Sequence, residues 1–206
     1  MQEKDYIERL QEKCKRINDP ELTELVNKLL EERMNLFDQA NIDTLTGVHN
    51  RRILSNIHQC SSLVICDIDN FKTINDKYGH LTGDKVIKEV ANALKNSIRD
   101  TDYICRYGGD EFIIIFTDCY DEEVIKKRLK EVQEKIAENL RLGSLQEPVS
   151  LSMGMVMNIK TDYLNDIKDL IVKADMALYY SKGNGKNKVT QYEEQTIKAN
   201  TSVSIK

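Results

Sequence analysis

Apolar residues recur with helical spacing at the start of the chain and gather into short continuous runs after residue 43. Residues 1–42 are rich in Glu, Lys and Leu and contain no glycine, which favours helix. Asp19 and Pro20 interrupt this pattern, because Asp suits an N-cap and Pro suits the first helical turn. The spacing therefore predicts two helices, the second with an apolar stripe made of Leu22, Leu25, Val26, Leu29, Leu30, Leu36 and Phe37. This stripe either packs on its own domain or forms the seam of a homodimer.

The runs after residue 43 predict strands alternating with helices. Strands are expected at 62–69, 103–107, 111–116, 149–156 and 188–192, and helices through the apolar positions of 86–98, 125–140 and 167–178. The first strand ends in Asp67 and Asp69, so both carboxylates should lie at its C-terminal end. Gly108 and Gly109 separate the second and third strands, and paired glycines supply the positive φ angles of a tight hairpin.

This order of elements, β-α-β-β-α-β with extra helices, predicts an α+β fold of the split ferredoxin-like kind. Such a fold has an antiparallel sheet with helices packed largely on one face. We expect a helical extension over residues 1–42, which is a possible dimerisation segment, and a folded domain over 43–192. The polar residues 193–206 should form a flexible tail.

Composition narrows the class of protein. The chain has 206 residues with 30 Lys and Arg against 34 Asp and Glu, and its net charge of −4 argues against binding nucleic acid. The charged N-terminus lacks the apolar run of a secretory signal, and no apolar stretch reaches the roughly 18–20 residues that span a bilayer. We therefore expect a cytoplasmic protein without a membrane span.

The cysteines do not indicate a cofactor or a disulfide framework. Their number, five, is odd, and no two of them form a C-x-x-C pair, so neither a zinc site nor a disulfide framework is predicted. Cys66 and Cys105 lie within apolar runs, where free cysteine usually acts as a small core residue.

An acidic group is the most informative feature of the sequence. Asp67 closes the first core strand, and Asp110 and Glu111 lie at the turn between the next two, so all three should meet at one edge of the sheet. Each of them alone could be a solvated surface residue. Together they would repel one another unless they share a proton or a cation, and hard oxygen ligands select Mg²⁺ or Mn²⁺.

The surroundings of these acids suggest a phosphate ligand. Gly108 and Gly109 carry no side chain, so a bulky anion could approach the backbone beside the acids. Lys72, Lys182 and Lys186 are candidate counter-charges, although a lone lysine is usually solvated surface. The combination suggests a nucleoside triphosphate whose phosphates are bridged by the metal.

Four separated motifs resemble one family. They are Asp43-Thr-Leu-Thr-Gly-Val-His-Asn-Arg-Arg52, the segment 67–84, Tyr107-Gly-Gly-Asp-Glu-Phe112, and Ala174-Asp-Met-Ala-Leu-Tyr-Tyr-Ser-Lys182 followed by Gly185-Lys-Asn. In this order they resemble the GGDEF family of bacterial diguanylate cyclases. The resemblance implies a palm-like, nucleotide-cyclase-like sheet and the condensation of two GTP into cyclic di-GMP with release of two pyrophosphates.

The resemblance also implies a metal site. It would hold two Mg²⁺ (or Mn²⁺) ions through Asp67, the backbone carbonyl of Ile68, Asp110 and Glu111. One ion would lower the pKa of a 3′-hydroxyl, and the other would stabilise charge on the triphosphate. Whether Asp110 or Glu111 accepts the proton stays open. Lys72 matches the position that stabilises the phosphate in the transition state.

Four further positions match the family's substrate contacts. Asn75 and Asp84 match the guanine readers, because a carboxylate can accept from guanine N1–H and N2–H and an amide offers a donor and an acceptor. GTP is therefore expected rather than a GTP and ATP pair. His80 matches another contact, and Phe71 should pack beneath the nucleotide. From the residues alone, Asp84 could instead be a helix N-cap, and Asn75 and His80 could be turn residues beside a glycine.

Three more positions concern product inhibition and phosphate binding. Arg99 and Asp102 match the family's R-x-x-D product-inhibition site, where cyclic di-GMP acts as feedback inhibitor, although they could also form a surface ion pair. Lys186 stands where the family usually has arginine, so the charge remains but a bidentate grip on phosphate does not.

A cyclic product made from two GTP requires two domains face to face, so a homodimer is expected and the apolar stripe of the second helix could promote it. Two alternatives remain open. The domain could be a catalytically silent module that binds GTP or cyclic di-GMP as a receptor, or it could make a linear or mixed dinucleotide.

Overall fold

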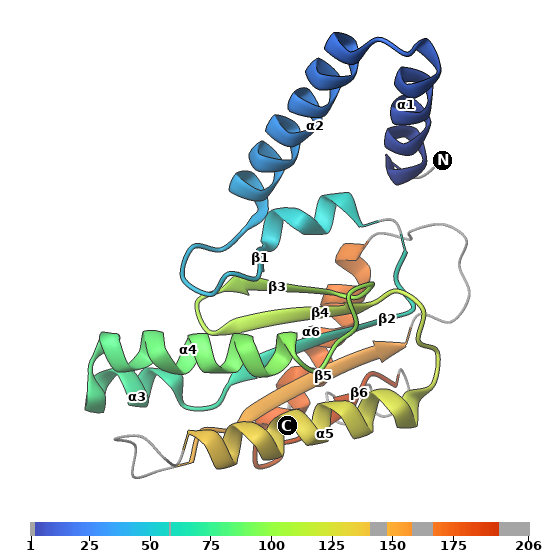
Figure 1. Ribbon diagram of the computed structural model, residues 1–206. Coiled ribbons are helices and arrows are strands. Elements are labelled where there is room, and N and C mark those ends of the chain that lie inside the picture. Colours follow the sequence, from blue (N-terminus) through green and yellow to red (C-terminus); the bar gives the residue numbers. More distant parts are fainter. Residues whose placement is uncertain (1–2, 58, 141–147, 158–166, 194–206) are drawn as a thin grey trace. The chain divides into compact units, whose positions relative to one another are not determined.

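The computed structural model describes residues 3–57, 59–140, 148–157 and 167–193. The chain divides into two compact units, residues 1–42 and residues 43–206 (Figure 1). Of the predicted tail, all residues after Glu193 lie outside the described part.

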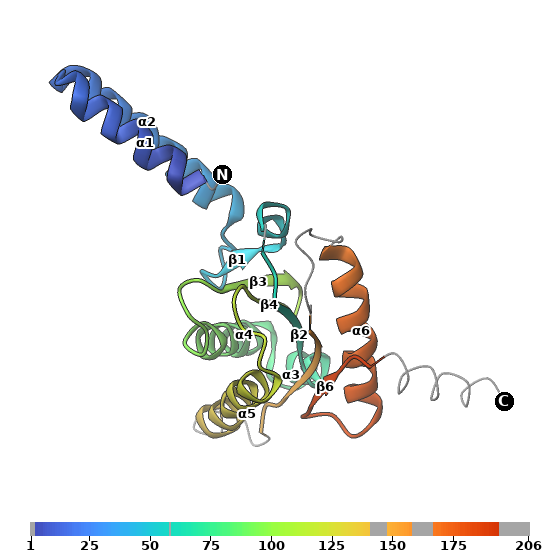
Figure 2. The same ribbon diagram turned by 90° about the vertical axis from the view of Figure 1, so that its right-hand side faces the viewer.

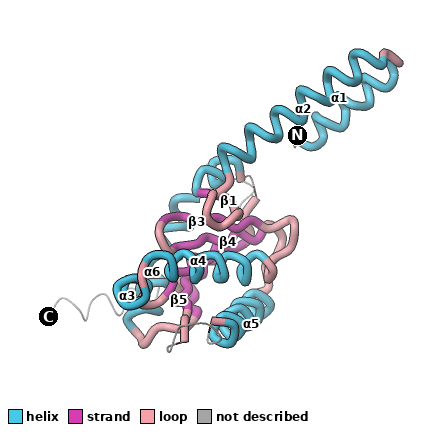
Figure 3. Tube along the Cα trace, turned by 60° about the vertical axis from the view of Figure 1, so that its left-hand side comes forward, coloured by secondary structure: helices cyan, strands magenta, loops and turns pink. Residues whose placement is uncertain are grey.

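The N-terminal unit consists of two helices, α1 (Glu3–Ile17) and α2 (Pro20–Asn41), which lie side by side (Figure 3). The Asp19 carboxylate caps α2 by accepting hydrogen bonds from the backbone N–H groups of Glu21 and Leu22 at 3.0 and 3.1 Å. The predicted helix start is thus confirmed. Several apolar side chains of α2 are exposed to solvent: Leu25, Leu29, Met34, Leu36 and Phe37.

The second unit is built on one six-stranded sheet with the order β1-β3-β4-β2-β5-β6. The strands are β1 (His49–Asn50), β2 (Ser62–Ile68), β3 (Tyr103–Gly108), β4 (Glu111–Phe116), β5 (Leu151–Met157) and β6 (Val189–Gln191). The four central strands are antiparallel, whereas β1 pairs parallel with β3 and β6 pairs parallel with β5. The predicted α+β fold is confirmed, but its sheet is mixed rather than wholly antiparallel. A helix connects β5 to β6, and such crossovers join parallel strands.

Helices cover both faces of the sheet. They are α3 (Phe71–Tyr78), α4 (His80–Lys95), α5 (Glu122–Asn139) and α6 (Ile167–Gly183), with a short 3₁₀ helix, η1, at Arg51–Asn56. Figure 2 shows α4 and α5 on one side of the strands and α6 on the other. The prediction that helices pack largely on one face is confirmed for α3, α4 and α5, and α6 adds a cover on the other face. None of the helices in the described residues has the length and apolar character needed to cross a membrane.

The reason for the two covered faces lies in β2, which is buried along its whole length. Val64 and Cys66 belong to the core under α4 and α5, while Leu63 and Ile65 belong to the core under α6. A strand that is apolar on both faces needs a helix on each. Cys66 and Cys105 are buried, and burial raises the pKa of the Cys105 thiol to about 12, which confirms that they act as core residues.

α6 lies unusually close to the sheet at Gly154 of β5. A Cβ at this glycine would lie 2.1 Å from the Ala174 carbonyl oxygen and 2.3 Å from the Leu178 backbone nitrogen. Because both are backbone atoms, no side chain could move aside to make room. Gly154 therefore sets the distance between β5 and α6, the helix that carries Lys182.

The segment after β2 differs from the prediction. Residues 71–78 form α3, and Gly79, with φ of +82°, separates it from α4. Asn75 thus lies within a helix and His80 is the first residue of the next, so their interpretation as turn residues is wrong. Asp84 lies in the second turn of α4, and its interpretation as an N-cap is also wrong.

Candidate active site

Two acids face each other at the ends of neighbouring strands. Asp67 of β2 and Glu111 of β4 are direct partners in the antiparallel register. Side chains alternate along a strand, so these two residues share a face with Ile65 and Ile113, which pack under α6. Lys182 reaches the same place from α6, and its Nζ lies 2.7 Å from Oδ2 of Asp67.

Burial and like charge make this place unfavourable for carboxylates. Burial raises the pKa of Asp67, and the charges of Asp110 and Asp69 raise it further, while Lys182 opposes both effects. Burial also raises the pKa of Glu111, helped by Asp67, Asp110 and Asp175. One ammonium group therefore offsets only part of the repulsion, and the site favours an additional positive charge.

The hairpin turn carries the third acid. β3 ends at Gly108 and β4 begins at Glu111, so Gly109 and Asp110 form the turn. Only Gly109 has a positive φ, of +50°, rather than both glycines. No atom lies within 4 Å of a Cβ built at either Gly108 or Gly109, so the backbone here is open to a ligand.

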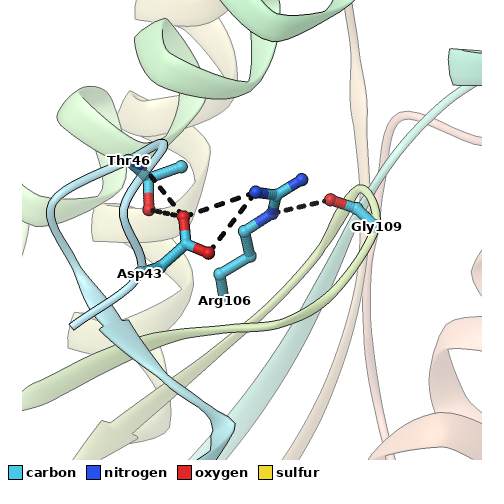
Figure 4. A network of polar contacts seen from close by, with 4 residues as sticks. All are labelled: Asp43, Thr46, Arg106 and Gly109. Atoms are coloured by element: carbon cyan, nitrogen blue, oxygen red, sulfur yellow. Dashed lines mark hydrogen bonds and ion pairs between the residues drawn. The ribbon is translucent and has the colours of Figure 1, made fainter. Parts of the chain in front are cut away.

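Arg106 ties this turn to Asp43 at the start of the domain (Figure 4). Its Nε donates to the Gly109 carbonyl at 2.8 Å, and its Nη1 lies 3.3 Å from Oδ1 of Asp43. Burial alone would raise the pKa of Asp43, but hydrogen bonds from Thr46 and the charge of Arg106 hold it below its usual value. The sequence alone assigned no role to Asp43, Thr46 or Arg106. The feature that could have indicated one is Arg106, a charged residue inside a predicted strand and close to the paired glycines.

Asp69 lies in a different environment from Asp67. Its carboxylate is buried and accepts hydrogen bonds from the hydroxyls of Ser150 and Ser152, both at 2.6 Å, and from the backbone N–H of Asn187 at 3.0 Å. Both oxygens are therefore engaged within the domain. Ser150 directly precedes β5 and Ser152 lies within it, and β5 pairs with β2.

The predicted cationic residues lie in different settings. Lys182 pairs with Asp67, as described above, and Nζ of Lys186 donates to Oδ1 of Asn70 at 2.6 Å. Lys72 is exposed on α3. The structure thus brings Lys182 directly to the acids and brings Lys186 to the residue that follows the β2 acids.

The predicted base-reading residues lie on α3 and α4. Phe71 is half-buried against the core, and His80 is exposed. Oδ1 of Asn75 is buried without a hydrogen-bond partner, and a Cβ at Gly83 would lie 2.0 Å from it. The absence of a side chain at Gly83 therefore makes room for Asn75 beside Asp84, which follows Gly83 in α4.

Arg99 and Asp102 do not form the surface ion pair that was the alternative interpretation. The Asp102 carboxylate accepts from the backbone N–H of Arg99 at 3.1 Å and from that of Thr117 at 3.2 Å. The Arg99 side chain is exposed. Asp102 thus holds the loop before β3, and the guanidinium of Arg99 is open to solvent.

Comparison with known proteins places this geometry in a family. Residues 40–188 match the sequence profile described as "Diguanylate cyclase, GGDEF domain". The chain belongs to the GGDEF family. Diguanylate cyclase DosC of Escherichia coli (strain K12) is 37% identical over 166 residues, which are 73% of this chain and 35% of that protein. Diguanylate cyclase DgcZ of the same strain is 31% identical over 169 residues, which are 77% of this chain and 56% of that protein.

Solved structures of the GGDEF family share the fold. The coiled coil and GGDEF domain of DgcB from Caulobacter crescentus, in complex with c-di-GMP, has a TM-score of 0.66 at 28% identity, covering 83% of this chain and 95% of that one. Diguanylate cyclase SiaD from Pseudomonas aeruginosa, in complex with its activator SiaC, has a TM-score of 0.70 at 25% identity, covering 91% and 76%. The chain spans a third to about half of the length of the two curated E. coli relatives named above.

The donor set of this GGDEF domain fits magnesium bound together with a nucleotide. Within the described residues, no three His, Cys, Asp or Glu side chains are gathered as a metal centre made of protein ligands alone. Magnesium, however, is usually held by one or two carboxylates, waters and substrate phosphates. Asp67 and Glu111 supply two such carboxylates across one strand pair, and burial together with neighbouring acids raises the pKa of both, so a nearby cation would favour their charged forms.

Neutralising Glu111 should stabilise the protein in the absence of divalent ions. A raised folded-state pKa means that the charged carboxylate opposes folding at pH values above it, and this effect vanishes as the pH falls and the group is protonated in the folded state. Glu111→Gln should therefore raise the Tm at neutral pH, and its advantage should shrink as the pH is lowered.

The measurement is thermal unfolding across a pH series in chelator, with Glu131→Gln on the exposed face of α5 as control. The control should change the Tm little at any pH. A Glu111→Gln protein that is less stable than the parent at neutral pH would contradict the electrostatic description of the site.

Proposed function

We propose that this protein is a diguanylate cyclase that condenses two GTP into cyclic di-GMP and two pyrophosphates. The observation that carries the proposal is the pairing of Asp67 with Glu111 across β2 and β4, with Lys182 of α6 beside them. This arrangement concentrates negative oxygen ligands and one cation where a metal-bound triphosphate could bind. The names of its relatives, DosC and DgcZ, support the same activity.

The residues that would hold Mg²⁺ (or Mn²⁺) are Asp67, the carbonyl of Ile68, Asp110 and Glu111. Two such ions, when bound, would acidify a 3′-hydroxyl and neutralise charge on the triphosphate. Lys182 and Lys186 would bind the phosphates as point charges, and Lys72 would stabilise the charge that develops on the α-phosphate. Asp110 or Glu111 would accept the proton from the 3′-hydroxyl that attacks.

Asn75 and Asp84 would select guanine. The carboxylate of Asp84 can accept from N1–H and N2–H, groups that adenine does not present in the same arrangement, and Asn75 can donate or accept beside it. Phe71 would pack beneath the base, and His80 would add a contact. Gly108 and Gly109 leave the hairpin backbone open to the phosphates.

Catalysis would require a homodimer. Each domain would bind one GTP, and the two 3′-hydroxyls would attack the α-phosphates across the pair. The exposed apolar residues of α2 make that helix a candidate dimerisation segment. The similar DgcB structure contains a coiled coil beside its GGDEF domain, which supports this role.

Cyclic di-GMP would also inhibit the enzyme at Arg99 and Asp102. The exposed Arg99 guanidinium could bind a guanine or a phosphate of the product. Asp102 shapes the loop through its bonds to the Arg99 and Thr117 backbones. The bound c-di-GMP in the DgcB complex supports product binding by a domain of this fold.

The purified protein should convert GTP and Mg²⁺ into cyclic di-GMP, and Asp67→Ala should lower the rate by at least roughly 100-fold because a metal ligand is lost. Chromatography of the products measures this, with GTP alone and with GTP plus ATP. Asp76→Ala, an exposed carboxylate of α3 without a proposed role, is the control and should keep the rate. Binding of GTP or cyclic di-GMP without any product would favour the silent receptor, and a linear or mixed dinucleotide would favour another cyclase.

The rate per domain should fall as the protein is diluted, because the active species is a pair of domains. The same product assay over a wide dilution series, together with light scattering, measures rate and assembly at each concentration. Constant activity per domain in a range where the protein is monomeric would contradict the proposed dimer.

Gly83→Ala should weaken GTP use while leaving the phosphate site intact. The added methyl would overlap Oδ1 of Asn75 and displace the amide, so KM for GTP should rise by roughly 5- to 10-fold, the value of about one hydrogen bond. Steady-state kinetics measure KM and kcat separately. Gly183→Ala is the matched control, because no atom lies within 4 Å of its Cβ position. An unchanged KM in Gly83→Ala would remove Asn75 from base recognition.

A further inference from the structure

The buried Asp69 carboxylate is the feature of the site that the proposed reaction leaves unused. It is 5% exposed, and it lies two residues after Asp67 at the end of β2. Its Oδ1 accepts from Ser152, and its Oδ2 accepts from Ser150 and from the backbone N–H of Asn187. The last of these bonds joins β2 to the loop that follows α6.

That loop has an unusual backbone. Gly185, Lys186 and Asn187 have φ angles of +99°, +60° and +47°, so three successive residues are left-handed. Asn70, which follows Asp69, has φ of +58°. In the described part of the chain, four residues other than glycine have a positive φ, and three of them meet at this junction. Such conformations persist where surrounding contacts hold them in place, and they cluster at functional sites.

The contacts that hold the loop come from both of its ends and from β2. The backbone N–H of Lys186 donates to the Ser181 carbonyl of α6 at 3.1 Å, and the Lys188 carbonyl accepts from the Met153 N–H of β5 at 2.8 Å. Between these anchors, Asp69 binds the Asn187 N–H and Asn70 binds Nζ of Lys186 at 2.6 Å. The left-handed part of the loop is therefore held by two consecutive residues of the β2 end.

We propose that Asp69 is a positioning residue that fixes the loop 185–187 so that the Lys186 ammonium lies beside the triphosphate site. This rests on the proposed function, in which Lys186 binds a phosphate of GTP. Asp69 acts through its hydrogen bond to Asn187, not as a ligand of the metal or of the nucleotide. Lysine has a long flexible side chain without the planar fork of arginine, so its contribution to phosphate binding depends on a fixed backbone.

The electrostatic cost of placing Asp69 beside the other acids supports a specific function for its carboxylate. The charge of Asp69 is one of the factors that raise the pKa of Asp67, so a further acid beside Asp67, Asp110 and Glu111 makes the charged form of Asp67 less favourable. A carboxylate has two acceptor oxygens, and here they receive three donors from β5 and from the loop.

The wild-type protein offers a first test without a variant. In the nucleotide-free protein, the Asn187 amide should exchange its hydrogen slowly, as a hydrogen-bonded amide does, when measured by NMR. Free exchange of this amide would overturn the proposal, whether or not the protein is a cyclase.

Two variants then separate hydrogen bonding from charge. Asp69→Ala removes the acceptor and should speed Asn187 exchange by roughly tenfold or more. Asp69→Asn keeps one oxygen for Asn187, and the Ser152 hydroxyl can turn to accept from the new amide, so exchange should stay close to wild type. If Asp69→Ala and Asp69→Asn sped the exchange of the Asn187 amide equally, Asp69 would act through its charge, and the proposal would be contradicted. Ser152→Ala is the matched control, because it removes a bond to Oδ1 and leaves the oxygen that holds Asn187.

A double-mutant cycle links the loop to the nucleotide. Calorimetry with Mg²⁺ and a GTP analogue that cannot react should give roughly tenfold weaker binding for Asp69→Ala, and less than about twofold further loss when Asp69→Ala is added to Lys186→Ala. If adding Asp69→Ala to Lys186→Ala weakened binding of the analogue by a further roughly tenfold, the positioning role would be overturned. Absence of binding by the wild-type protein would refute the proposed function and the phosphate role of Lys186, while the exchange of Asn187 would still decide whether Asp69 holds the loop.

Discussion

The structure is organised around a repulsion between carboxylates that the fold forces together. Asp67 and Glu111 are partners in an antiparallel register, so the pairing of β2 with β4 fixes their backbones opposite each other. Burial and mutual charge raise the pKa of both. Lys182 supplies one positive charge at 2.7 Å from Asp67, and the remaining imbalance makes the site suited to cations.

The rest of the domain keeps this arrangement rigid. Gly154 lets α6 lie close enough to β5 for Lys182 to reach the acids, and Arg106 joins the Gly109 carbonyl of the turn to Asp43. Asp69 and Asn70, which directly follow β2, hold the loop that carries Lys186. Apart from the local bond between Arg106 and Gly109, these contacts join segments distant in the chain, so the folded domain holds the turn and the loop in place before any ligand binds.

Much of the fold could be predicted from the sequence because its signals were local. The apolar run before Asp67, the paired glycines of the hairpin and the Asp19 cap each depend on neighbouring residues, and the structure contains all three features. The helix over residues 71–78 was not predicted because it is only half-buried and mostly polar. The parallel pairing of the edge strands β1 and β6 depends on long-range contacts, which local spacing does not encode.

The candidate site also combines features that local sequence signals predict with features that depend on long-range packing. The pairing of Asp67 with Glu111 could be predicted because the strand order places these two residues at one edge of the sheet. The different surroundings of Asp67 and Asp69 could not be predicted. They depend on which residues near β5 and in the loop after α6 lie beside Asp69 and donate hydrogen bonds to it. The fit of Gly83 to Asn75 likewise depends on how two helices pack.

The proposed activity requires that the acids at the ends of β2 and β4 hold divalent ions against a guanine nucleotide. Manganese provides the most direct measurement, because its paramagnetic resonance signal distinguishes bound from free ion. With an unreactive GTP analogue, the protein should bind Mn²⁺ at this site, and the Asp67→Asn protein should lose that binding while keeping its thermal unfolding transition. Equal Mn²⁺ binding by both proteins, or none by the parent in the presence of the analogue, would mean that these acids do not hold the ion.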